Sequence, residues 1–198
     1  YVPPERPVML ETQQGYPYGY YNCGLAHGIP GPMAALALAW MQGYRVPGQH
    51  EALMFLRDWI LRYTLFDQWG INWPTYVPLP VSQSSDKWKR LPPARAGWCY
   101  GAPGVARALW LTGQALEEPA LCKTAVHAIE AVLKRPIAEW RLISPTLCHG
   151  IAGLLAICLR FAQETESSII RDSIPLLVEQ ILDLFNPALI LLAQRPAA

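Results

Sequence analysis

The chain has 198 residues, of which 52% are apolar and 16% are charged, and its formal net charge at pH 7 is +1. This composition is typical of one globular domain with a substantial core, and it excludes an intrinsically disordered protein. The near-neutral charge gives no electrostatic reason to expect nucleic acid or an anionic membrane as a partner. No apolar run approaches the ~20 residues of a membrane-spanning helix.

Helical patterns begin after an irregular lead-in over residues 1–22. A first helix is expected to begin near Gly31 and to end at Gly43, because glycine commonly follows the last turn of a helix. Pro47 and Gly48 open a second helix, in which apolar residues recur at helical spacing.

Residues 66–94 form a long connection rich in Trp and Pro. A loop of this length inside a compact domain is usually functional or flexible. Two more helix pairs follow, over residues 103–115 with 119–134 and residues 151–164 with 167–184. The last segment, residues 186–198, is apolar and has no clear pattern.

These segments predict three helical hairpins and an all-α fold. The first helix of each hairpin is nearly all apolar and the second is amphipathic. A helix that is apolar on all sides must be buried on all sides, so we expect an inner layer of first helices wrapped by the second helices. A stacked solenoid and a closed α/α ring both satisfy this requirement.

The same short motif precedes the first helix of each hairpin. The three copies are Ala26-His27-Gly28-Ile29-Pro30-Gly31, Cys99-Tyr100-Gly101-Ala102-Pro103-Gly104 and Cys148-His149-Gly150-Ile151-Ala152-Gly153. In a closed ring of repeats, equivalent positions meet at the centre. The repeat therefore predicts that Cys, His and Tyr side chains converge on one site.

Cys99, Cys148 and His149 form a possible zinc-binding set. Three protein ligands leave one tetrahedral position open, which is typical of a catalytic zinc. Two thiolates cancel the charge of the metal, so a substrate thiolate at the fourth position would stay nucleophilic. The alternative is that these cysteines are simply small apolar residues of the core.

His27, Tyr100, Arg95 and Trp98, in or near the motifs, are further candidates for the same site. His27 occupies the repeat position of Tyr100 and His149, and its pKa range suits proton transfer. Arg95, just before the second motif, could stabilise a developing enolate oxygen, and Trp98 could line the pocket. The alternatives are a capping or core histidine, a surface arginine and a core tryptophan.

The remaining cysteines and histidines carry weaker signals. Five cysteines at these spacings do not resemble a disulfide scaffold, so a reducing, cytoplasmic setting is expected. Cys23 fits either the pocket or the core. Cys122 and Cys158 are expected to pack within helices, and His50 and His127 to lie on outer helices.

The motifs in combination resemble the lanthionine cyclases of the LanC-like family. The resemblance rests on Gly24-Leu25-Ala26-His27-Gly28, Arg95-Ala96-Gly97-Trp98-Cys99-Tyr100-Gly101 and Cys148-His149-Gly150-Ile151-Ala152-Gly153, and runs from about Tyr16 to about Leu184. It implies an α/α toroid and Zn²⁺ held by Cys99, Cys148 and His149.

The resemblance also implies a reaction. A cysteine thiol of a dehydrated lanthipeptide precursor would add to dehydroalanine or dehydrobutyrine, which forms a lanthionine or methyllanthionine ring. His27 would be the acid/base residue and Arg95 the active-site arginine, with Tyr100 and Trp98 lining the cavity. The dehydratase and the export transporter of the same pathway are the further expected partners.

Two departures from the family limit this interpretation. Family members are about twice as long, and their active-site aspartate, which precedes the first motif, has no counterpart here. Since the chain begins at Tyr1 without a signal peptide, we expect a partial cyclase whose exposed inner-helix edges cause self-association.

Three alternatives to an active cyclase remain. One is a catalytically incomplete remnant that binds peptides. Another is a different α/α toroid enzyme that activates a peptide thiol with zinc, such as a prenyltransferase-like protein, although the motifs fit it poorly. A toroidal glycosidase fits less well, because it needs paired carboxylates in its cavity.

Overall fold

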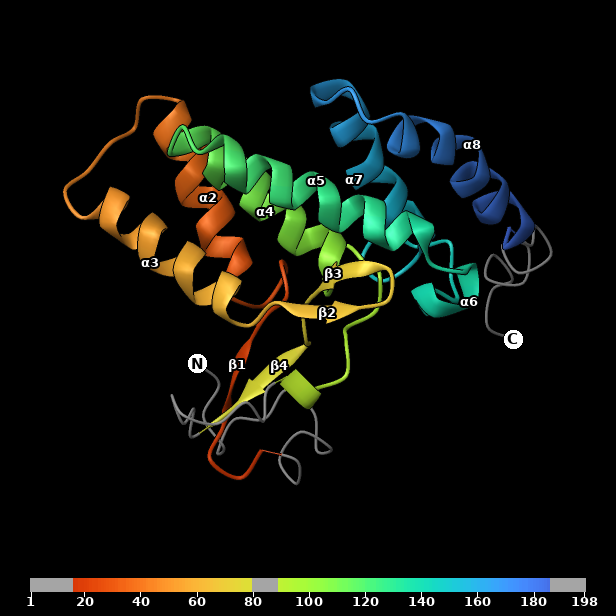
Figure 1. Cartoon of the computed structure of the whole chain (residues 1–198), viewed down its shortest axis with the longest axis horizontal. Helices are drawn as coiled ribbons and strands as arrows, with labels where there is room; N and C mark the ends of the chain where they lie inside the picture. The colour runs from red at the N-terminus through yellow and green to blue at the C-terminus, as the bar shows by residue number, and fades with distance from the viewer. Residues whose placement is uncertain (1–15, 80–88, 186–198) are drawn as a thin grey trace, which may run out of the picture.

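The computed structural model describes residues 16–79 and 89–185, and its helices form three hairpins (Figure 1). The pairs are α2 (Pro30–Met41) with α3 (Gln49–Arg62), α4 (Ala102–Ala115) with α5 (Pro119–Lys134), and α7 (Ile151–Glu164) with α8 (Ser168–Asp183). These bounds agree closely with the predicted helices. Proline in the first turn of α2, α4 and α5 costs no hydrogen bond there, which helps to define where these helices begin.

The hairpins form two layers. Helix α4 packs against α2 on one side and α7 on the other, and these three make the inner layer. Helix α3 packs on α2 and α4, α5 packs on α4 and contacts α8, and α8 packs on α7. The predicted inner and outer layers are therefore confirmed.

Burial differs among the three inner helices. Most residues of α4 are buried, as a helix apolar on all sides requires. The same expectation is wrong for α2 and α7, where Leu38, Met41 and Leu159 are exposed. Within the described residues, α4 has an inner neighbour on both sides, whereas α2 and α7 each have one.

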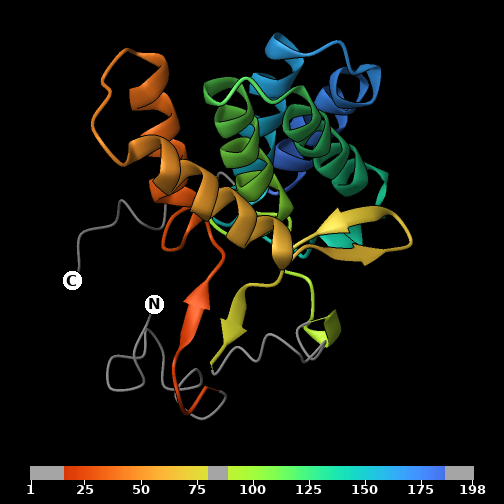
Figure 2. The same cartoon turned by 60° about the vertical axis from the view of Figure 1, so that its left-hand side comes forward.

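Short strands lie in the two segments predicted to be irregular. β1 (Tyr20–Asn22) pairs antiparallel with β4 (Tyr76–Pro78), and β2 (Leu65–Asp67) pairs antiparallel with β3 (Gly70–Asn72). Figure 2 shows the β1–β4 ladder extending away from the helical layers. The connection 66–94 is thus partly ordered, which corrects the prediction of a plain loop.

Buried contacts hold this connection to the helices. The indole of Trp73 is fully buried and donates a hydrogen bond to the carbonyl oxygen of Ile60 at 2.9 Å. Arg135, which follows α5, forms an ion pair with Asp67 at 2.8 Å. The short helix α6 (Ile137–Trp140) follows and buries Trp140. The lead-in before Tyr16, residues 80–88 and the apolar segment 186–198 lie outside the described residues.

Candidate active site

The loops before α2, α4 and α7 share the same close approach of a glycine to a main-chain carbonyl group. At each of six glycines, an added Cβ would lie within 3.0 Å of a main-chain carbonyl oxygen six positions earlier. The glycine and carbonyl pairs are Gly28 with Asn22, Gly101 with Arg95, Gly150 with Ser144, Gly31 with Leu25, Gly104 with Trp98, and Gly153 with Leu147. Only glycine permits this close approach of two backbones, so the sequence repeat is also a structural repeat.

The three loops lie side by side, with Cys99 in the middle. The amide of Ala26 donates to the Cys99 carbonyl oxygen at 3.4 Å, and the amide of Cys99 donates to the Cys148 carbonyl oxygen at 3.0 Å. Equivalent positions of the repeat are therefore neighbours in space.

The two motif thiols are in contact. Cys99 is buried and Cys148 is exposed, and their side chains share a hydrogen bond. Burial first, and then Cys148, raises the pKa of the Cys99 thiol to about 11, although the charge of Arg95 acts in the opposite direction. The pair thus has one thiol in the protein interior and one that an incoming molecule can reach.

His149 does not join the two thiols. Among the described residues, no group of three or more His, Cys, Asp or Glu side chains is arranged to hold a metal ion. His149 follows Cys148 directly and is exposed, so packing does not hold its side chain in one orientation. The structure therefore brings together two of the three predicted ligands.

His27, Tyr100 and Trp98 connect the three loops to one another. The ring centroids of His27 and Tyr100 are 6.2 Å apart. The first and second loops therefore contact each other through these two rings. Trp98 is half-buried and packs on the hydrophobic core. Its carbonyl oxygen lies against Gly104 of its own loop, and its Cβ lies against Gly153 of the third loop. Trp98 therefore connects the second loop to the third.

Arg95 is exposed and lines a cavity of about 460 Å³. Arg141, Tyr16 and Tyr76 also line it, together with Pro92 and other apolar residues. This lining offers two guanidinium groups and two phenols to a bound molecule.

Asn22 is a site residue that the sequence analysis missed. It is 3% exposed, and its amide nitrogen donates to the phenol oxygen of Tyr100 at 3.1 Å. The sequence repeat offers a signal for it. Asn22 lies six residues before Gly28, just as Arg95 lies six residues before Gly101.

The remaining cysteines and histidines are residues of the core or of the outer helices. Cys23 and Cys158 are buried in the core, and burial raises the pKa of each thiol to about 12. Cys122 is half-buried. His50 and His127 lie exposed on the outer helices α3 and α5.

Residues 5–194 match the sequence profile of the lanthionine synthetase C-like proteins. The chain belongs to this family. It is 29% identical over 164 residues to the nisin biosynthesis protein NisC of Lactococcus lactis subsp. lactis, a match that covers 81% of this chain and 38% of NisC.

A solved structure of nisin cyclase has the same fold. It superposes with a TM-score of 0.77 at 26% identity, covering 94% of this chain and 46% of that chain. The chain therefore spans less than half the length of these relatives, and its layers of helices are part of an α/α toroid, as predicted. None of the described helices of this family member is long and apolar enough to cross a membrane.

Proposed function

We propose that this chain carries the thiol-activating half of a zinc-dependent lanthionine cyclase. The single observation that carries the proposal is the contact between the Cys99 and Cys148 thiols where the three glycine loops converge. Membership of the lanthionine synthetase C-like family and the similarity to nisin cyclase support the reaction class.

The residues present fit a zinc ion in their chemistry. Cys99 and Cys148 would supply two sulfur ligands, and His149 would become the third by turning its exposed side chain. When bound, zinc deprotonates a substrate thiol at neutral pH. Because two protein thiolates already cancel its charge, the substrate sulfur would remain nucleophilic.

The proposed reaction is the addition of a precursor cysteine to a dehydroamino acid. The thiolate sulfur bonds to the β-carbon of dehydroalanine or dehydrobutyrine, and the π electrons move toward the α-carbon and the amide oxygen. A proton then reaches the α-carbon, so the product is an isomer of the substrate. His27 would transfer that proton, and Arg95 and Tyr100 would stabilise the charge on the amide oxygen.

The cavity beside Arg95 would hold the peptide near this centre. Its two guanidinium groups and its apolar wall suit an extended peptide with polar carbonyl groups. Trp98 would support the wall through its contacts with the third loop. We also propose a cytoplasmic setting, with the dehydratase and the export transporter of the pathway as partners.

Zinc content tests the metal part of this proposal. We expect about one zinc per wild-type chain after purification with zinc present, and loss of that zinc in Cys99→Ala and Cys148→Ala. Cys122→Ala is the matched control, since that half-buried thiol lies outside the loops. A folded wild-type chain that binds no zinc would contradict the proposal.

Thiol loss tests the reaction. The probe is a model peptide with one dehydroalanine and one cysteine, whose free thiol disappears on cyclisation without a change in mass. We expect the chain to accelerate thiol loss and Cys148→Ala to abolish the acceleration. Peptide binding with thiol loss no faster than in buffer would instead favour a catalytically incomplete remnant that binds peptides.

A further inference from the structure

Asn22 is buried between the first two loops at the end of β1. The β1–β4 ladder pairs it with Tyr76, and the repeat places it at the position of Arg95. Its own carbonyl oxygen accepts from the amide of Ile29 at 3.0 Å. Both its backbone and its side chain are therefore held in place.

The hydrogen bonds of Asn22 define which way its side-chain amide points. The backbone amide of Gly24 donates to Oδ1 at 2.8 Å. Because a backbone amide can only donate, this atom must be the side-chain oxygen. The atom that lies 3.1 Å from the phenol oxygen of Tyr100 is then Nδ2, which can also only donate. The Tyr100 oxygen is thus an acceptor in this bond.

A second phenol, that of Tyr76, contacts Tyr100. The rings of Tyr76 and Tyr100 meet edge to face with centroids 6.0 Å apart. Burial first, and then a hydrogen bond with Tyr100, raises the pKa of Tyr76. Asn22 donates to the phenol oxygen of Tyr100, so the Tyr100 proton is free to point to another acceptor.

We propose that Asn22 is a positioning residue that makes the Tyr100 phenol an acceptor toward the protein and a donor toward the substrate. This inference rests on the proposed cyclisation, in which negative charge develops on the amide oxygen of the dehydroamino acid. A donor already aimed at that oxygen needs no reorientation during the reaction. Asn22 itself does not touch the reacting atoms.

Asn22→Asp tests this directly, because aspartate has nearly the same shape but no N–H. One carboxylate oxygen still accepts from Gly24, and the other makes Tyr100 donate toward the protein. With the model peptide, we expect kcat to fall about 100-fold while KM changes little. Asn72→Asp is the matched control, since Asn72 is also buried and its Oδ1 accepts from the backbone amide of Trp73.

An NMR measurement separates this inference from the proposed reaction. With tyrosines isotope-labelled at Cζ, and Tyr100 assigned through Tyr100→Phe, we expect the Tyr100 resonance to move in Asn22→Asp and not in Asn72→Asp. An inactive wild type would defeat the proposed function, yet a moved resonance would still support the orientation of Tyr100. An unmoved resonance, or a moved one with unchanged kcat in an active enzyme, would overturn the role of Asn22.

A second variant covers the case in which Asn22→Asp does not fold. Tyr76→Phe removes the phenol hydroxyl that hydrogen-bonds to Tyr100 and leaves the Asn22 bond intact. We expect the Tyr100 resonance to move by a smaller amount and kcat to fall by less than in Asn22→Asp. If Tyr76→Phe changes neither quantity, the shared positioning of Tyr100 is wrong.

Discussion

Single glycines decide how closely the three loops approach each other. Each motif glycine faces a carbonyl oxygen of its own loop, and Gly153 also faces Trp98 of the neighbouring loop. The positions of Cys99, Cys148 and Tyr100 depend on this spacing, because these residues lie between a motif glycine and the carbonyl group that it faces. The geometry of the site therefore depends on the absence of a side chain at each of these glycines.

Gly153→Ala should disturb this spacing. Its Cβ would overlap the Leu147 carbonyl oxygen and lie 2.7 Å from the Cβ of Trp98, so two backbone segments must move. We expect the free energy of unfolding, measured with urea, to fall by at least ~2 kcal/mol. Gly97→Ala is the control, since its Cβ would have no neighbour nearer than 3.5 Å, and equal losses in both variants would contradict this explanation.

The sequence could locate part of the site at this scale. Cys99 and Cys148 were found from the repeat alone, because equivalent positions in stacked repeats become neighbours. Asn22 was not found, since its partner Tyr100 is 78 positions away and asparagine beside a loop usually indicates a turn. The predicted roles of His27, Arg95 and His149 remain predictions.

Neighbouring inner helices are also joined by a surface ion pair. Arg107 of α4 donates two hydrogen bonds to Glu164 of α7, at 2.6 and 2.8 Å. The aromatic ring of Phe161, one turn earlier on α7, lies 5.9 Å from the Arg107 guanidinium carbon. This link strengthens the contact between the second and third hairpins.

Arg107→Gln should weaken that contact in a pH-dependent way. Burial alone would raise the pKa of Glu164, but the hydrogen bonds and charge of Arg107 lower it below its usual value of 4.5. A carboxyl with a lowered folded pKa stabilises the fold above its unfolded pKa, and this stabilisation is lost as the pH falls through the folded pKa. We expect a loss of ~1 kcal/mol at neutral pH, which shrinks as the pH falls below 4.5.

Urea unfolding at several pH values measures this effect. Arg171→Gln is the control, because its partner Glu166 is almost fully exposed and such pairs contribute little. A stability difference for Arg107→Gln that stays constant down to acidic pH would show that packing, rather than the ion pair, is responsible.

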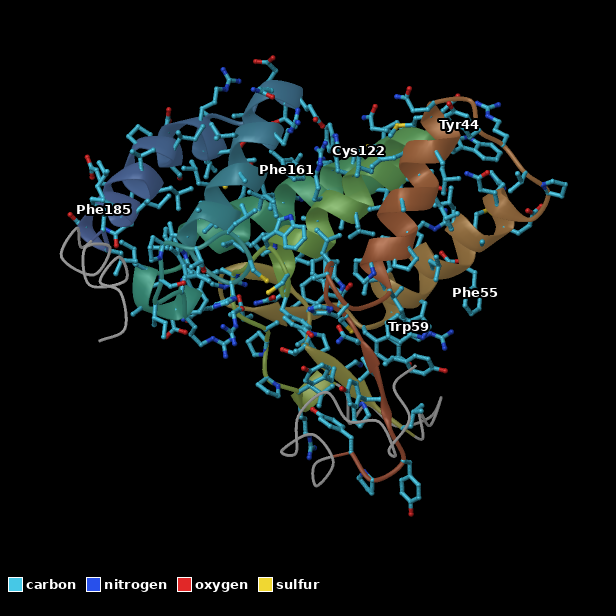
Figure 3. All side chains as sticks on the ribbon, turned by 180° about the vertical axis from the view of Figure 1, so that it is seen from behind. Tyr44, Phe55, Trp59, Cys122, Phe161 and Phe185 are labelled. Atoms are coloured by element: carbon cyan, nitrogen blue, oxygen red, sulfur yellow. The ribbon has the colours of Figure 1, made fainter. Side chains whose placement is uncertain are left out.

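At the scale of the whole molecule, the inner layer formed by the described residues 16–79 and 89–185 has an open end at α2 and another at α7. Leu38 and Met41 of α2 are 46% and 38% exposed, and Leu159 of α7 is 42% exposed. Figure 3 shows other apolar side chains at the surface, with Phe55 on α3 and Phe185 after α8. Exposed apolar side chains of this kind favour association.

We therefore expect the chain to self-associate as its concentration rises. Sedimentation velocity should show a larger average mass for the wild type than for the double variant Leu38→Lys with Met41→Lys. Phe66→Lys is the control, because this residue is 77% exposed on the β2–β3 hairpin, away from the open end of α2. A wild type that stays monomeric at high concentration would contradict the prediction.

The sequence by itself determined the helices, their pairing and the convergence of the three motif loops. These features follow from local periodicity and from glycines that recur at fixed spacing, and both can be read without knowledge of distant contacts. Only the tertiary structure decided the strands, the exposure of α2 and α7, and the hydrogen bonds of Asn22. Three-residue strands are too short to show alternation, and burial and side-chain pairing depend on which distant segments become neighbours.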